Sequence, residues 1–448
     1  MTVNVRFLVL AVALFLTTAC AAHRQLHPST VPVDVAAPLS DPRARAQVET
    51  SSIERYPGYT IAIVEFDDQG RFWDRRQVAA LAAELTRQAS ADEKSGLGML
   101  VFVHGWRNDS RVCDKALVAF REFVHRISVD DLGKLPRRHP LIGIYVAWRG
   151  FSSHVWPFEF FSFGSRKEAA SRIASGDVPE LLTYLDSFWR ELNASREEAS
   201  RLVVIGHSLG GTIVFEALAS LYKERLAEGW PGVDVNGESH VLPGFGDLVL
   251  LVNPAFPAER WRSIHDLAAS YASFSKEQEP LLVVASSESD WATSRYFPIA
   301  QRFGTMFQKT RDDEQRRALV TAIGHYQPFV THHLRRADLP AGDRSHVPSA
   351  YDIANCVCEM PPMLAAPEVG ELMTKPGTAD EPGEGWGAQP CIAERHIGPL
   401  LLACGPNVQR GNPFWVISVA PNVLHEHTGF FNPYFLAFAR DLVVGKLE

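Results

Sequence analysis

The sequence predicts a doubly wound, mostly parallel α/β sheet, because short apolar runs alternate with longer amphipathic segments along most of the chain. The apolar runs are rich in Val, Ile and Leu and nearly continuous, as is typical of strands whose two faces are both covered by helices. The chain has 448 residues, of which 46% are hydrophobic and 21% charged. This is an ordinary globular composition with ample chain to bury a core.

Seven apolar runs are the predicted strands, at residues 59–66, 98–105, 140–148, 201–208, 247–254, 280–287 and 413–421. Helical patterns cover residues 76–88, 113–127, 178–192, 212–227 and 433–444. Two segments interrupt the alternation, near residues 150–177 and 340–410. We expect both to be inserts that run over the open edge of the sheet, as lid segments.

The N-terminal residues 1–20 have the pattern of a secretory signal, with Arg6 before an apolar stretch at 7–16 and small residues after it. The end of this segment, Thr-Ala-Cys20, resembles a bacterial lipobox, which implies that Cys20 becomes a lipidated N-terminus. Thr17 stands where that pattern prefers leucine, so a plain signal peptide cleaved shortly after Cys20 is the alternative. We expect a lipid-anchored protein of the cell envelope, in the outer membrane or periplasm, or else a secreted one.

Residues 21–55 are polar and proline-containing, and predict a tether rather than part of a core. The catalytic domain is then expected at 56–448. The formal net charge is −8 and no basic block is present. A nucleic-acid partner is therefore not expected.

Four of the six cysteines fall in the second insert: Cys356, Cys358, Cys391 and Cys404. In an oxidising compartment this clustering predicts two disulfides, with the pairing left open. A zinc site is the alternative, but the spacing matches structural zinc patterns poorly.

The segment GHSLGG places Ser208 at the joint between a predicted strand and a predicted helix, with Gly206 and Gly210 two residues to either side. An ordinary turn of small residues would have the same sequence pattern. A nucleophilic serine at such a joint needs small residues at these two positions, because its strained backbone leaves no room for larger ones. We therefore predict that Ser208 is a nucleophile.

A second turn, His104-Gly105-Trp106, follows the predicted strand at 98–105. Together the two turns resemble the α/β-hydrolase family, whose lipase and esterase members carry a His-Gly-x turn at this place. The resemblance covers the chain from about residue 59 onward. It implies an oxyanion hole made by the backbone N–H groups of Trp106 and Leu209, and an acid and a histidine that follow the serine in chain order.

The acid is expected just after the strand at 280–287, where Asp290 is the first choice. Glu288 is the second choice and Asp266, on the preceding helix, the third. Asp290 could alternatively act only as the N-cap of the helical segment that follows it.

The base is expected after the last strand, where His427 fits the family loop better than His425. The His-x-His spacing also permits a metal site, but no third ligand lies beside it in the sequence. Three other histidines are rivals expected at the surface or at helix caps: His325, His332 and His333. His207, beside the nucleophile, is expected to pack rather than react.

These parts imply acyl transfer to water through Ser208, His427 and Asp290, with no cofactor and no metal. A carboxylic ester is the expected substrate. Lipid or other hydrophobic esters are suggested by the aromatic residues of the first insert, which could instead simply pack a helix onto the sheet: Phe151, Trp156, Phe158, Phe160, Phe161 and Phe163. The alternatives are a thioesterase, amidase or transacylase on the same triad, and a non-catalytic envelope protein that binds a partner.

Overall fold

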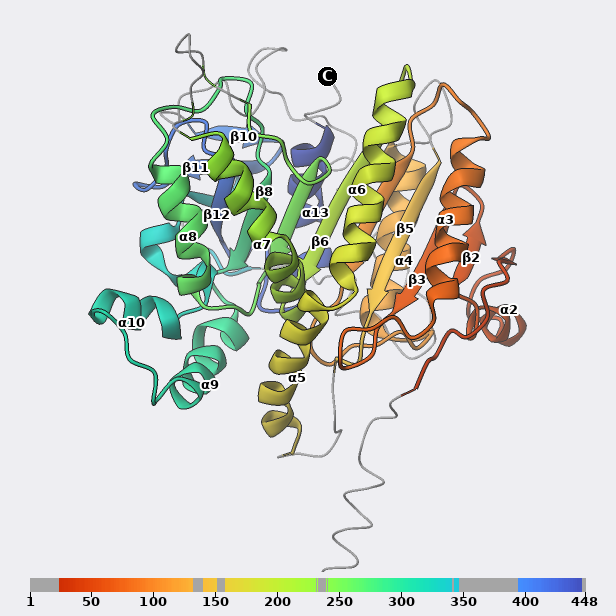
Figure 1. Ribbon diagram of the computed structural model, residues 1–448, viewed down its shortest axis with the longest axis horizontal. Helices are drawn as coiled ribbons and strands as arrows, with labels where there is room; N and C mark the ends of the chain where they lie inside the picture. Colours follow the sequence, from red (N-terminus) through yellow and green to blue (C-terminus); the bar gives the residue numbers. More distant parts are fainter. Residues whose placement is uncertain are drawn as a thin grey trace, which may run out of the picture.

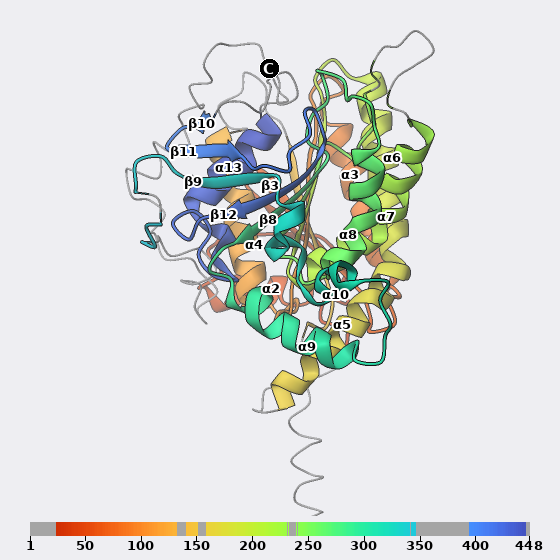
Figure 2. The same cartoon turned by 90° about the vertical axis from the view of Figure 1, so that its left-hand side faces the viewer.

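The computed structural model describes residues 24–131, 140–150, 158–230, 232, 239, 241–340, 342–345 and 394–444. Within these residues a single twelve-stranded sheet runs in the order β1-β2-β3-β5-β4-β6-β7-β8-β12-β9-β11-β10 (Figures 1 and 2). The strands are β1 (Val33–Asp34), β2 (Ile53–Tyr56), β3 (Tyr59–Glu65), β4 (Gly98–Val103), β5 (Leu141–Ala147), β6 (Arg201–His207), β7 (Leu248–Val252), β8 (Leu282–Ser287), β9 (His332–Arg336), β10 (Arg395–Ile397), β11 (Leu400–Cys404) and β12 (Phe414–Val419). From β3 across to β9 all neighbours are parallel, and antiparallel pairs flank this region on both sides. The predicted α/β class is confirmed.

The seven predicted strands correspond to β3 through β8 and β12, and they form the buried centre of the sheet. Side chains that alternate along each strand enter two separate cores. In β4, Val101 and Val103 face one core while Leu100 and Phe102 face the other. The remaining strands lie toward the edges and are short or polar. β9, for example, reads HHLRR and gives no apolar run.

Helices cover both faces of the sheet: α3 (Arg75–Ala89), α6 (Val178–Ser195), α7 (Leu209–Glu228) and α8 (Ala258–Ala269) lie on one side, and α4 (Lys115–Arg126) and α13 (Pro433–Val444) on the other (Figure 2). The other α-helices of the described residues are α2 (Pro42–Val48), α5 (Phe158–Ser175), α9 (Phe297–Gly304) and α10 (Asp313–Val320). Helix α5 occupies most of the first predicted insert and packs on α7. Among the described residues, no helix has the length and apolar character needed to cross a membrane.

Residues 24–56 fold onto the domain, in contrast to the predicted tether. Strand β2 pairs with β3, and Val48 of α2 is fully buried in a small third core. His27 is also buried, and its two ring nitrogens bond the carbonyl oxygens of Ser51 (2.8 Å) and Ser110 (2.6 Å). Hydrogen bonds rather than an apolar period hold much of this segment, which is why the sequence pattern does not reveal it.

Several predicted features lie outside the described residues. They are the signal segment with Cys20, the cysteines Cys356, Cys358 and Cys391, and the aromatic residues Phe151 and Trp156. The side chains of Phe158, Phe160 and Phe161 also lie outside them. The lipidation of Cys20 and the two disulfides therefore stay predictions.

Candidate active site

Ser208 stands at a strained turn between β6 and α7, with φ +55° and ψ −120°. The glycines beside it make this turn possible. A Cβ on Gly210 would lie 2.0 Å from the carbonyl oxygen of Val103, and one on Gly206 would lie 2.8 Å from the Cα of Gly211. Strain of this kind persists only where the surroundings impose it, and it is concentrated at functional sites.

Ser208, His427 and Asp290 form a continuous hydrogen-bonded chain. The Nε2 of His427 lies 2.8 Å from the Oγ of Ser208, and its Nδ1 lies 2.9 Å from the Oδ2 of Asp290. The three residues follow β6, β12 and β8, whose carboxyl ends meet at one edge of the parallel sheet. Ser208 and Asp290 are buried, while the His427 side chain is 24% exposed. The structure thus brings together the three residues predicted to carry the chemistry.

The alternative acids and base take other positions. Glu288 accepts a hydrogen bond from the Ser418 hydroxyl at 3.1 Å, and Asp266 lies 3.0 Å from the Nδ1 of its neighbour His265. The Nε2 of His425 lies 3.9 Å from the carboxylate of Glu426. The hydrogen-bonded chain to Ser208 runs through the first-choice residues.

Asp290 is ionised at neutral pH despite its burial. Burial alone would raise its pKa, but the charge and hydrogen bond of His427, together with hydrogen bonds from Thr293, lower that pKa to about 2. Its Oδ1 accepts the backbone N–H groups of Ala292 (2.9 Å) and Thr293 (3.2 Å). Oδ1 of Asp290 therefore caps the following helical turn, while Oδ2 of the same carboxylate binds His427.

Two side chains that sequence reasoning did not assign to the site fix the backbone of the His427 loop. The Nε2–H of His207 donates to the carbonyl oxygen of His427 at 2.8 Å, and the amide of Asn253 donates to the carbonyls of Glu426 and His427 at 3.0 Å. Asn253 also accepts the backbone N–H of Ser287, so it ties the loop to the end of β8. Its position after a strand, before Pro254, is the only sequence signal that could have pointed to it.

His207 packs, as the sequence predicts. Its ring stacks on Phe430 with centroids 4.3 Å apart, and burial beside His427 lowers its pKa to about 3. A neutral His207 that donates from Nε2 has an unprotonated Nδ1, so its role is to hold a carbonyl rather than to transfer a proton.

The His104-Gly105-Trp106 turn lies against the nucleophile. A Cβ on Gly105 would approach the Cβ of Ser208 to 2.7 Å, which only glycine avoids. Among the residues that the structure describes, the backbone N–H groups of Trp106 and Leu209 donate no hydrogen bond. Two unused donors beside a strained serine match the arrangement expected for an oxyanion hole.

His104 stabilises this turn as a neutral residue. Burial lowers its pKa to about 4, and its Nε2 accepts the backbone N–H of Trp148 at 3.1 Å. Its Nδ1–H therefore donates to the carbonyl oxygen of Gly105 at 3.0 Å. The indole of Trp148 donates in turn to the carbonyl oxygen of His104 at 2.9 Å.

The predicted aromatic cluster contributes one described side chain to the site. Phe163 of α5 packs edge-on against the ring of Trp106, with centroids 5.4 Å apart. The guanidinium of Arg107 lies 4.6 Å from the same ring. This contact shows that α5 packs next to the candidate oxyanion turn.

Behind Asp290 lies a second histidine. The Thr293 hydroxyl donates to the Oδ2 of Asp290, and the Nε2 of His325 lies 2.8 Å from that hydroxyl oxygen. Because the threonine proton is committed to the carboxylate, His325 donates its own N–H to the threonine. Burial lowers the pKa of His325. The expectation of a surface or capping residue is wrong here, since His325 contacts the group that holds the candidate acid.

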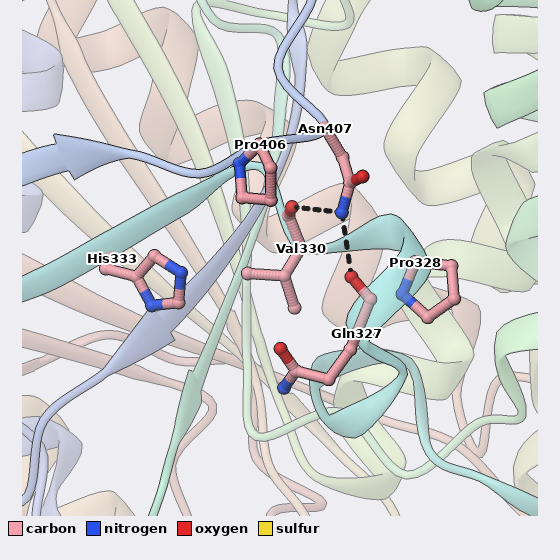
Figure 3. Close-up of a pocket in the computed structure, with 6 residues that line it drawn as sticks. All are labelled: Gln327, Pro328, Val330, His333, Pro406 and Asn407. Atoms are coloured by element: carbon pink, nitrogen blue, oxygen red, sulfur yellow. Dashed lines mark hydrogen bonds between the residues drawn. The ribbon is translucent and has the colours of Figure 1, made fainter.

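His332 and His333 are not at helix caps either. His332 is buried in β9 with its ring 4.3 Å from that of Trp415, so a surface position is wrong for it. His333 is half-buried and lines two hollows. One, of about 320 Å³, also holds His325 and Glu288. The other, of about 260 Å³, is also lined by Asn407, whose amide donates to the backbone carbonyls of Gln327 and Val330 (Figure 3).

Comparison of the chain with protein-family models, with curated proteins and with solved structures gives no match in any of the three. In the described part of the chain, no three His, Cys, Asp or Glu side chains are grouped so that they could hold a metal ion. Since an α/β sheet hosts many activities, function has to be inferred from the side chains at the site.

Proposed function

We propose that the protein is a serine hydrolase of the α/β-hydrolase type that cleaves carboxylic esters, including hydrophobic or lipid esters. The observation that carries this proposal is the hydrogen-bonded chain from Ser208 through His427 to Asp290, with distances of 2.8 Å and 2.9 Å. It begins at a serine held in a strained strand-to-helix turn. A serine hydroxyl is a weak nucleophile and needs such a base and orienting acid.

In the acylation step, His427 Nε2 removes the Ser208 proton while Oγ attacks the ester carbonyl carbon. The backbone N–H groups of Trp106 and Leu209 stabilise the oxyanion that forms. Asp290, ionised through its low pKa, stabilises the positive charge that His427 acquires. His427 then protonates the leaving alkoxide as the tetrahedral carbon–oxygen bond breaks, leaving an acyl-enzyme.

Deacylation repeats these steps with water in place of the serine. His427 activates the water, the water attacks the acyl carbon, and Ser208 leaves with its proton restored. Thioester, amide or transacylation chemistry would use the same residues and differ only in the leaving or attacking group. The residue pattern of the N-terminal segment supports export of this enzyme and attachment of lipid at Cys20.

A fluorophosphonate probe tests the proposal directly, because it labels only activated serines. We expect the wild-type chain to be labelled, and the Ser208→Ala and His427→Ala variants to lose labelling. His425→Ala is the matched control in the same loop and should be labelled like the wild type. Labelling that persists in Ser208→Ala, or that is lost in His425→Ala but not in His427→Ala, would contradict the assignment.

The substrate class is tested with p-nitrophenyl esters of increasing chain length. Hydrolysis that extends to long acyl chains supports the hydrophobic-ester part of the proposal. Activity confined to acetate and butyrate would restrict the enzyme to short esters. Equal labelling without hydrolysis of any ester would direct attention to thioesters and amides.

A further inference from the structure

A cluster of exposed apolar side chains follows the candidate acid directly. Of the ten large hydrophobic residues that are exposed in the described part of the chain, six fall between residues 291 and 307. They are Trp291, Tyr296, Ile299, Phe303, Met306 and Phe307, which we call the α9 patch. Phe303 is 74% exposed and Phe307 is 90% exposed. Single exposed hydrophobic residues are ordinary, but six of them between residues 291 and 307, with the rings of Trp291 and Tyr296 in contact, point to an interaction surface.

The core does not need the α9 patch, because α9 already buries its other face. Phe297 is 1% exposed and Gln301 is 8% exposed. Lys167 of α5 lies 4.9 Å from the ring of Phe297 and bonds the side chain of Gln301. Ile299 and Phe303 are therefore additional apolar residues on the face that points away from the protein.

The charges within this segment have one sign. Residues 291–311 contain Arg295, Arg302, Lys309 and Arg311, and no aspartate or glutamate. All four are exposed, and Arg311 is paired with Asp312, the first of three exposed acidic residues (Asp312, Asp313 and Glu314) that directly follow this segment. Aromatic and aliphatic residues interleaved with exposed cations are the composition of helices that lie in the interface of an anionic bilayer.

The position of the α9 patch matches its composition. Helix α9 and the first turns of α5 lie at the lower end of the molecule, toward which the carboxyl ends of the central parallel strands point (Figures 1 and 2). The described chain also starts at this end, in red in both views. Trp291 is the direct neighbour of Asp290, so a surface that contacts the patch also faces the edge of the sheet that carries the candidate site.

We propose that the α9 patch docks the protein onto an anionic lipid bilayer, with Phe303 and Phe307 in the interfacial region and Arg295, Arg302 and Lys309 next to the lipid phosphates. The docked orientation turns the carboxyl edge of the sheet toward the membrane. This surface does not depend on the reaction at Ser208, and it would give the proposed hydrolase access to membrane-borne substrates. It acts independently of any lipid attached at Cys20.

Vesicle co-sedimentation tests the proposal on the full chain in a Cys20→Ala background, so that no lipid is attached at that position. The vesicles are phosphatidylcholine alone, or phosphatidylcholine with phosphatidylglycerol. We expect the parent chain to bind the anionic vesicles, and Phe303→Ser/Phe307→Ser to lower the partition coefficient by at least about tenfold, since two large apolar side chains lose their burial. The matched control is Val31→Ser/Val241→Ser, which removes exposed apolar residues elsewhere and should bind like the parent.

A separate variant tests the contribution of the exposed cations to vesicle binding. Arg302→Gln/Lys309→Gln should weaken binding to the anionic vesicles by about tenfold and leave binding to neutral vesicles unchanged. Fluorophosphonate labelling and hydrolysis of a soluble short ester should be equal in all variants, which separates loss of docking from loss of the site. A failure of labelling in every protein would count against the proposed hydrolase but not against docking.

Two results would overturn the docking proposal. One is vesicle binding that is absent from the parent chain or unchanged in Phe303→Ser/Phe307→Ser. The other is a parent chain that sediments as a dimer, together with a Phe303→Ser/Phe307→Ser variant that is monomeric but still binds vesicles. In that case the patch is covered by a second copy of the chain.

Discussion

Asp290 is linked to two histidines, His427 and His325, and only His427 also contacts Ser208. His427 bonds the Oδ2 directly at 2.9 Å and reaches Ser208 with its other nitrogen. His325 reaches the same oxygen only through the Thr293 hydroxyl, and borders a polar hollow. The carboxylate is shared, so proximity to an acid does not by itself make a base. The position of the nucleophile decides which histidine can act.

Replacing the shared carboxylate should have the largest effect. Asp290→Asn keeps the shape and the Oδ1 that caps the following turn, but it removes the charge that stabilises protonated His427. We expect kcat/KM for a short ester to fall by roughly 10³- to 10⁴-fold, as in triads of this kind. Steady-state kinetics with the active-site concentration fixed by titration measures this change.

The control for this variant is Asp266→Asn, a third-choice acid that lies on α8 and pairs with His265. It should retain wild-type kcat/KM. If Asp290→Asn kept more than about a tenth of the activity, far above the residual expected for a broken triad, Asp290 would serve as a helix cap only.

Substitutions of Thr293 and His325, on the side of Asp290 away from Ser208, should have a smaller effect. Thr293→Val keeps the side-chain shape but removes the hydroxyl between Asp290 and His325, so we expect kcat to fall by about tenfold with KM unchanged, the value of one hydrogen bond to a charged group. His325→Gln acts only through Thr293 and should cost about threefold. The split between kcat and KM identifies both as positioning residues.

These two variants also test whether His325 takes part in proton transfer. A loss in His325→Gln as large as that in Asp290→Asn would mean that His325 takes a direct part in proton transfer. The double variant Thr293→Val/His325→Gln should be no worse than Thr293→Val alone, because both changes interrupt the same hydrogen bond.

The sequence predicts the side of Asp290 that faces Ser208 better than the side that faces away. Strand ends, chain order and the two glycine-flanked turns are local signals, and they identify Ser208, Asp290 and His427. Thr293, His325 and Asn253 carry no comparable local signal, because they act through hydrogen bonds between segments that are distant in the chain.

The parts of the fold that the sequence predicts are likewise those with a local signal. The seven central strands are visible because burial on both faces requires continuous apolar runs. Strand β9 is not, because it lies outside the seven central strands, between β12 and β11, where its partly buried positions tolerate the sequence HHLRR. The segment at 24–56 is misread as a tether since its attachment depends on groups such as His27, whose partners lie elsewhere in the chain.

His332, a buried histidine of β9 outside the candidate site, should have the smallest effect on activity. His332 packs on Trp415, and burial lowers its pKa from the ordinary 6.5 to about 3. The unfolded chain therefore gains a proton below about pH 6.5 that the folded chain does not gain until about pH 3. The free energy of unfolding should fall with decreasing pH across this window, by up to about 1.4 kcal/mol per pH unit for this histidine, and no further below it. His332→Phe, measured by urea unfolding at pH 7, 6 and 5, should lose that part of the slope while kcat/KM at pH 7 stays unchanged. An unaltered slope would show that His332 titrates alike in the folded and unfolded chain, and that its burial does not hold it neutral.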